Sequence, residues 1–171
     1  MKKRIFPLIA CGIFIISACG DSNTPPPAAQ EKTALVSVTA SGKSFENDLI
    51  RAIVPDRWWL KDDSRIGMMM ILPETGNPEK SGVYLKFEGP NWTGTPEDSI
   101  AEMAKNYQGT PPQSVVCNGR TFVQTSYEYS GSKQTMMIAK KDGTKITVTL
   151  EGAEHAASPA VRQILESLVI K

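Results

Sequence analysis

The sequence contains few of the side chains on which most catalytic and metal centres are built. His155 is the only histidine among its 171 residues, so the common catalytic and zinc sites that need several imidazoles cannot form. Because it lies in a polar stretch before a predicted helix, we expect it to be a solvated loop residue. Gly89, Gly94 and Gly109 stand singly, and no glycine-rich phosphate loop is present. The sequence therefore predicts no catalytic residue and no cofactor, and we expect a protein that is not an enzyme.

Cysteine is nearly as scarce. The three cysteines are Cys11, Cys19 and Cys117, and the first two belong to an N-terminal segment that is expected to be processed. Cys117 is then the one free thiol of the remaining chain, without a partner for an internal disulfide.

The chain also lacks an excess of charge of either sign. Its formal net charge is +1, and its first 18 residues hold three cations (Lys2, Lys3 and Arg4) and no acid. Without that segment the chain is slightly acidic. Since nucleic-acid binding requires a basic face, we expect no nucleic-acid partner.

The apolar run near the N-terminus is too short to remain as a membrane-spanning helix. It extends from Ile5 to Ile16 directly after the three cations, whereas a permanent span needs ~20 residues. It ends at the small residues Ser17 and Ala18, followed by Cys19. Cations, a short apolar core and small residues at its end are the layout of an export signal.

The motif Ile16-Ser17-Ala18-Cys19 resembles the lipobox of bacterial lipoproteins, with Ile in the place usually held by Leu. The resemblance implies that residues 1–18 are a signal peptide and that Cys19 is acylated, palmitate being a typical chain. Two or more acyl chains anchor a protein stably to a membrane. The alternative is an ordinary secretory signal cut near the same small residues.

Residues 19–33 predict a tether between the lipids and a folded domain. Its central part, Asp21 to Lys32, has almost no large apolar residues and contains Pro25-Pro26-Pro27. In extended polyproline geometry, at ~3.1 Å per residue, this part would reach up to about 35–40 Å. Gly20 stands where enteric lipoproteins retained in the inner membrane carry Asp. This favours the outer membrane, facing the periplasm.

Residues 34–171 predict a single α+β domain. Helices are expected at 96–107, with Thr95 as N-cap, and at 159–168, with Ser158 as N-cap, because each pairs a capping residue with Pro and an apolar stripe. Turns are expected at Asn118-Gly119, Gly131 and Asp142-Gly143. Alternating or short apolar runs predict strands at 49–54, 66–72, 83–87, 114–117, 120–129, 133–140 and 144–150. We expect an antiparallel β-sheet flanked by helices.

The order of these elements resembles the PsbP family. The phrase Val54-Pro55-Asp56-Arg57-Trp58, the helix at 96–107, the Asn118-Gly119 turn and the closing segment Ile164-Leu165-Glu166-Ser167-Leu168 carry the resemblance, which covers roughly residues 45–170. Arg57 replaces the Gly that often precedes the Trp. The resemblance implies an α/β/α sandwich, with the two helices on opposite faces of one sheet. It also implies a mostly non-catalytic accessory role, as in DcrB-type envelope lipoproteins.

Soft sulfur ligands suggest a first alternative. Met68-Met69-Met70, Met136-Met137 and Cys117 supply thioethers and a thiol that copper(I) prefers. Consecutive strand residues point to opposite faces, so Met68 and Met70 would have to meet Met136 or Met137 on a neighbouring strand. The simpler interpretation is core packing, for which methionine is well suited.

Paired carboxylates suggest a second alternative, a hydrolase of envelope polymers. Asp62-Asp63 is expected in a loop and therefore solvated, while Glu97-Asp98 is explained by its place at a helix N-terminus. Neither pair has the spacing of a calcium loop. Two buried acids ~5–10 Å apart in one cleft would favour this alternative.

The tryptophans are the leading candidates for a partner surface. Trp58 and Trp59 are adjacent, so both cannot face the core of an extended segment, and Trp92 lies in the loop 88–95. Tryptophan is enriched where proteins bind partners. The leading hypothesis is a membrane-anchored accessory or binding protein that contacts another envelope protein or a small ligand through Trp58, Trp59 and Trp92. A purely structural role stays open.

Overall fold

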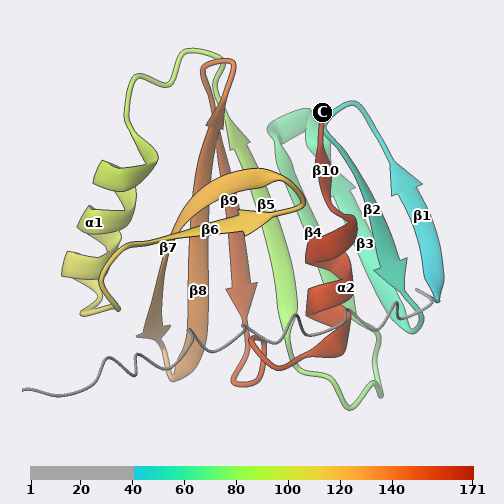
Figure 1. Ribbon diagram of the computed structural model, residues 1–171. Helices are drawn as coiled ribbons and strands as arrows, with labels where there is room; N and C mark the ends of the chain where they lie inside the picture. Colours follow the sequence, from blue (N-terminus) through green and yellow to red (C-terminus); the bar gives the residue numbers. More distant parts are fainter. Residues whose placement is uncertain (1–40) are drawn as a thin grey trace, which may run out of the picture. The chain divides into compact units, whose positions relative to one another are not determined.

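The computed structural model describes residues 41–171 (Figure 1). The predicted signal peptide 1–18, the predicted acylation site Cys19, the predicted tether 19–33 and residues 34–40 lie outside the described residues. Within them, no helix has both the length and the apolar character needed to cross a membrane.

Two antiparallel sheets and two α-helices make up the described residues, which confirms the α+β prediction. The expectation of a single sheet is wrong. The smaller sheet has the order β1 (Gly42–Glu46), β2 (Ile50–Pro55), β10 (Val169–Ile170). The larger has the order β3 (Trp58–Asp63), β4 (Met68–Pro73), β5 (Gly82–Glu88), β9 (Thr144–Glu151), β8 (Ser132–Lys141), β7 (Arg120–Tyr129), β6 (Gln113–Cys117).

Both predicted helices form where their caps place them. In α1 (Pro96–Asn106), the Thr95 hydroxyl accepts a hydrogen bond from the Asp98 backbone N–H at 3.1 Å. In α2 (Pro159–Ser167), Ser158 accepts one from the Val161 N–H at 3.1 Å. Each cap satisfies a backbone donor that the helix itself leaves free, and Pro at the first position has no such donor to lose.

The Asn118-Gly119 turn joins β6 to β7, as predicted. Both residues have positive φ, 45° and 77°, which is the conformation that a two-residue hairpin turn requires. Figure 1 shows this hairpin bending over the larger sheet towards α2. Two contacts fix it there: the Asn118 side-chain amide donates to the Leu168 carbonyl at 3.0 Å, and the Cys117 thiol donates to the Leu165 carbonyl at 3.1 Å.

The two helices lie on opposite sides of the larger sheet. Along β8, Met137 and Ala139 pack in the core on the α2 side, whereas Ile138 packs with Ile100 of α1. The α2 side holds the main core, closed by α2 and the smaller sheet. On the other side α1 packs on β7 and β8.

The expectation of a loop at Asp62-Asp63 is wrong. Both residues belong to β3, where Asp62 pairs with Met69 and Asp63 with Met68 of β4. Aspartate disfavours strands, but pairing along the whole of β4 outweighs that local preference. The strand ends with a short 3₁₀ turn, η1 (Ser64–Ile66), and Asp62 accepts the Ser64 backbone N–H at 2.8 Å.

Candidate functional site

Trp58 and Trp59 point to opposite faces of β3, as the alternation of an extended strand requires. Trp58 is 6% exposed and belongs to the main core, whereas Trp59 is 40% exposed. Trp59 pairs with Leu72. It lies on the same face of the larger sheet as α1, but α1 packs on β7 and β8, away from Trp59. The adjacent tryptophans therefore serve different surfaces.

Trp92 lies at the other end of the sheet. Trp58 pairs with Pro73 at one end of the β3–β4 ladder, while the Trp92 backbone N–H donates to Gly143 in the turn at the opposite end of β9. The ammonium groups of Lys140 and Lys145 lie 5.2 and 5.6 Å from the centre of its ring. The three tryptophans predicted to contact a partner therefore do not form one surface.

A groove of about 710 Å³ opens beside Trp58. This volume is typical of ligand-binding clefts. We call it the Trp58 groove. Three segments that are distant in the sequence line it, namely the β2–β3 turn, the loop at 77–79 and the outer side of α2. Its lining residues are Ser41, Ile53, Pro55, Asp56, Arg57, Trp58, Asn77, Pro78, Glu79, Pro159, Ala160, Arg162, Gln163, Glu166 and Ser167.

Hydrogen bonds to Arg57 hold one wall of the groove. Its carbonyl accepts the Glu74 backbone N–H at 2.8 Å and the Asn77 side-chain amide at 2.9 Å. Its guanidinium donates to the Gly76 carbonyl at 2.9 Å. Arg57 has a φ of 63°, a left-handed conformation that favours glycine. These bonds stabilise a strained turn and join it to the loop after β4.

The opposite wall is α2, which is fixed to β2. The Ser167 hydroxyl accepts the Ile53 backbone N–H at 2.9 Å and donates to the Ile164 carbonyl at 3.0 Å. The Gln163 amide donates to the Ser41 carbonyl at 2.8 Å. The polar groups that position this wall are thus already paired within the protein.

The lining of the groove combines charges of both signs with apolar surface. Its basic residues are Arg57 and Arg162, and its acidic residues are Asp56, Glu79 and Glu166. None of the five forms an ion pair with another described residue. Trp58, Ile53, Ala160 and three prolines supply the apolar surface. Such a surface suits an extended polypeptide that carries both apolar and charged side chains.

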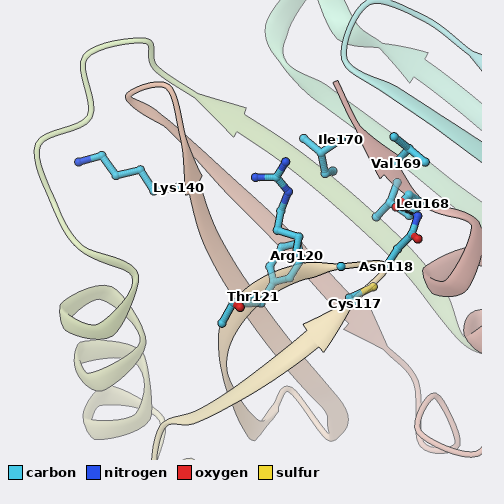
Figure 2. A pocket seen from close by; sticks show the side chains of 10 residues that line it. Cys117, Asn118, Arg120, Thr121, Lys140, Leu168, Val169 and Ile170 are labelled. Atoms are coloured by element: carbon cyan, nitrogen blue, oxygen red, sulfur yellow. Dashed lines mark hydrogen bonds between the residues drawn. The ribbon is translucent and has the colours of Figure 1, made fainter.

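A second hollow of about 450 Å³ lies between the tip of the β6–β7 hairpin and β10 (Figure 2). Arg120, Asn118 and Cys117 line one side, and Leu168, Val169 and Ile170 the other. Burial and the nearby carboxylate of Glu166 raise the pKa of the Cys117 thiol, so the reactive thiolate is disfavoured.

His155 is not the solvated loop residue expected from the sequence. It is 7% exposed, its Nδ1 lies 2.7 Å from the Gly152 carbonyl and its Nε2 lies 2.8 Å from the Thr135 hydroxyl. A carbonyl only accepts, so Nδ1 carries the hydrogen. Thr135 in turn bonds the Ser126 hydroxyl at 2.7 Å. Because Thr135 and His155 are both buried, this chain of bonds fixes the β9–α2 connection to the sheet.

The methionines do not meet as the copper(I) alternative requires. β4 and β8 are separated by β5 and β9. Met70 lies in one row with Tyr84, Thr149 and Met136, and Met69 in one row with Leu85, Val148 and Met137, so two strands intervene in both rows. Met69 and Met137 are 1% and 3% exposed in the main core. For these two, the core-packing interpretation is confirmed.

No carboxylate is buried among residues 41–171, and no cluster of three or more His, Cys, Asp or Glu side chains within them could hold a metal ion. The paired buried acids that would favour the hydrolase alternative are therefore not found there. Glu97 and Asp98 occupy the first turn of α1, as predicted. The sequence did not indicate Arg162 and Glu166 as groove residues, and it marked Arg57 only as a departure from the Gly of the PsbP pattern, since no local pattern distinguishes charged groove residues from ordinary solvated ones.

No protein-family model and no curated protein matches the chain. Among solved structures, a protein of Bacteroides thetaiotaomicron is similar with a TM-score of 0.53 at 12% sequence identity. The match covers 77% of this chain and 49% of that one, so this chain spans about half the length of that neighbour. LpqN, which is involved in cell envelope biogenesis of Mycobacterium tuberculosis, gives a TM-score of 0.46 at 17% identity, covering 75% of this chain and 90% of LpqN. The Bacteroides match shows a shared fold.

Proposed function

We propose that this protein is a membrane-anchored envelope lipoprotein that binds a segment of another envelope protein, without catalysing a reaction. Residues 1–18 would be removed as a signal peptide, and acyl chains, palmitate among them, on Cys19 would hold the chain to a membrane. The periplasmic side of the outer membrane is the favoured location. The partner would bind in the Trp58 groove.

The N-terminal sequence supports the anchor. Three cations, a dozen apolar residues and Ile16-Ser17-Ala18-Cys19 together form a signal that is too short to stay as a membrane span. Once the signal peptide is cleaved, the mature chain no longer carries its apolar segment. Multiple acyl chains on one cysteine then provide the hydrophobic attachment to the membrane.

The turn at Arg57 supports the PsbP-like interpretation of the domain. The family often has Gly before the Trp, and here Arg57 adopts a φ of 63° at that position. A glycine would meet the same backbone requirement without strain. The opposite placement of α1 and α2 on the larger sheet also agrees with an α/β/α sandwich.

The observation that carries the binding proposal is the Trp58 groove itself. It combines a volume of about 710 Å³, an apolar lining that includes Trp58, and five charged side chains free of ion pairs with the described residues. Its open shape and its charges of both signs favour a polypeptide segment over a small ligand of one charge.

Mass spectrometry of the N-terminal peptide from the membrane fraction tests the anchor. We expect a mature chain that begins at acylated Cys19, and a Cys19→Ala variant that leaves the membrane fraction. A bare, unmodified N-terminus on protein released into the medium would contradict this part of the proposal.

Photo-crosslinking in cells tests the groove. A benzophenone side chain at position 162 lies in the groove, and one at position 59 lies on the opposite face of the larger sheet. A third, at position 65 in η1, serves as a control because the Arg65 side chain is 90% exposed. We expect a specific envelope protein to crosslink from position 162 and not from position 65. Glu166→Lys should abolish this product, while Glu128→Lys on exposed β7 should preserve it. Crosslinks from position 59 alone would move the partner to the other face and overturn the groove proposal.

A further inference from the structure

The charged side chains that line the hollow at the β6–β7 hairpin are all basic, whereas the Trp58 groove is lined by charged side chains of both signs. Its lining residues are Cys117, Asn118, Gly119, Arg120, Thr121, Phe122, Lys140, Leu168, Val169 and Ile170. This set contains two basic side chains and no acidic one. Glu166 lines the Trp58 groove and not this hollow, although its carboxylate is close enough to Cys117 to raise the pKa of that thiol.

Arg120 is the cation that this hollow presents to a ligand. Its side chain is half-buried, and within residues 41–171 it forms no ion pair and no side-chain hydrogen bond. Figure 2 shows its guanidinium extending from β7 towards Ile170. The Lys140 ammonium extends away from Arg120 in the same view, donates to the Gly94 carbonyl at 3.2 Å and lies over the Trp92 ring.

The walls around Arg120 are held in place by the protein. The Asn118 amide donates to the Leu168 carbonyl at 3.0 Å, and the Cys117 thiol donates to the Leu165 carbonyl at 3.1 Å. These two bonds join the hairpin tip to the end of α2. The hollow therefore exists before any ligand binds, which lowers the cost of ordering a site.

Apolar side chains lie beside the guanidinium. Val169 and Ile170, which are partly exposed, supply most of this apolar surface; Leu168 and Phe122 also line the hollow but are 4% and 2% exposed. A volume of about 450 Å³ is much larger than a bare oxyanion requires. The hollow thus offers one cation, free of ion pairs within residues 41–171, next to an apolar surface.

We propose that this hollow binds a phosphate group carried on a short apolar chain, with Arg120 as the phosphate ligand. A planar guanidinium forms two parallel hydrogen bonds to phosphate oxygens. Asn118 also lines the hollow, across from Arg120 and beside Leu168 (Figure 2). The apolar walls cover the carbon chain next to the phosphate. The phosphate comes either from a lipid headgroup or from a soluble phosphate ester.

Titration of the full chain in zwitterionic lipid nanodiscs with hexyl phosphate tests the site. Amide NMR shifts at residues 117–121 and 168–170 report binding at the hollow. We expect hexyl phosphate to shift these amides and Arg120→Gln to weaken its affinity at least tenfold. Arg120→Lys keeps the charge but loses the planar guanidinium, so its affinity for hexyl phosphate should lie between those of the unmodified protein and Arg120→Gln. Arg65→Gln, which removes an exposed arginine elsewhere, should bind as the unmodified protein does.

Two further probes separate the sources and the alternatives. Nanodiscs that contain phosphatidylglycerol should shift the same amides if the phosphate belongs to a lipid, and leave them unshifted if it belongs to a soluble ester. Inorganic phosphate should bind at least tenfold more weakly than hexyl phosphate. Equal affinities for the two would overturn the role of the apolar walls. An Arg120→Gln variant that keeps its thermal unfolding midpoint and binds hexyl phosphate with unchanged affinity would overturn the site.

Discussion

The two faces of the larger sheet are covered to very different extents. On the α2 side, buried residues from both sheets and α2 form one continuous core, from Ile50 in β2 to Ile164 in α2. On the other side the buried cluster consists of Ile100, Val123 and Ile138, with Trp92 and Met136 packed against it. Trp59 and Met68 stay 40% and 37% exposed there. The α2 side therefore supplies most of the stability, while the α1 side leaves part of the sheet open to solvent.

The largest expected effect is the loss of an α2 core side chain. Ile164 is fully buried in the main core, where the surrounding side chains limit collapse of the space left behind. Ile164→Ala should lower the free energy of unfolding by about 4 kcal/mol, measured by urea denaturation. If Ile164→Ala lowered the free energy of unfolding by less than the matching change in α1, the α2 side would not supply most of the stability.

The matching change in α1 should cost less. Ile100 is also fully buried, but its cluster is small and borders partly exposed residues, so the helix can move inward to close the space. We expect Ile100→Ala to lower the free energy of unfolding by about 2 kcal/mol. Amide hydrogen exchange should speed up in α1 and stay unchanged in α2, because local opening requires only the contacts of α1. Equal acceleration in both helices would show that the two faces unfold as one unit.

A smaller effect concerns the open part of the α1 side, where Tyr84 lies. Burial and a hydrogen bond with Glu151 raise the pKa of Tyr84 to about 12. The folded protein holds this proton more tightly than the unfolded chain, whose tyrosine has a pKa of about 10. The resulting stability is complete below pH 10 and is lost as the pH rises towards 12.

Tyr84→Phe should therefore flatten the decline in unfolding free energy between pH 10 and pH 12. Urea denaturation at closely spaced pH values measures this slope. If the variant and the unmodified protein declined in parallel, Tyr84 would not be the group that ionises on this face.

Much of the fold follows from local sequence signals. The Thr95 and Ser158 caps, the prolines after them and the Asn118-Gly119 turn all act within four residues of the backbone groups they satisfy. Because such interactions form within a short segment, they can be predicted without knowing the tertiary structure. The strand at Asp62-Asp63 could not be predicted in this way, since its cause is a partner strand that completes the ladder.

The candidate site was predicted only in part. The sequence indicated that Trp58 and Trp59 must separate, and the structure confirms that separation. It could not indicate which of them borders the groove, because the other walls come from residues 77–79 and 159–167. His155 was misassigned for the same reason: its hydroxyl partner Thr135 is 20 residues away along the chain.

The sequence alone determined the helices, the hairpin turns, the α+β class and the prediction of an acylated Cys19, since each depends on neighbouring residues. The tertiary structure decided which side chains are buried, which strands pair and where Arg57, Arg120 and Arg162 meet apolar walls. Burial and pairing depend on contacts between segments far apart in the chain. Local preferences constrain those contacts but do not select among them, so the Trp58 groove and the Arg120 hollow emerge only in the folded protein.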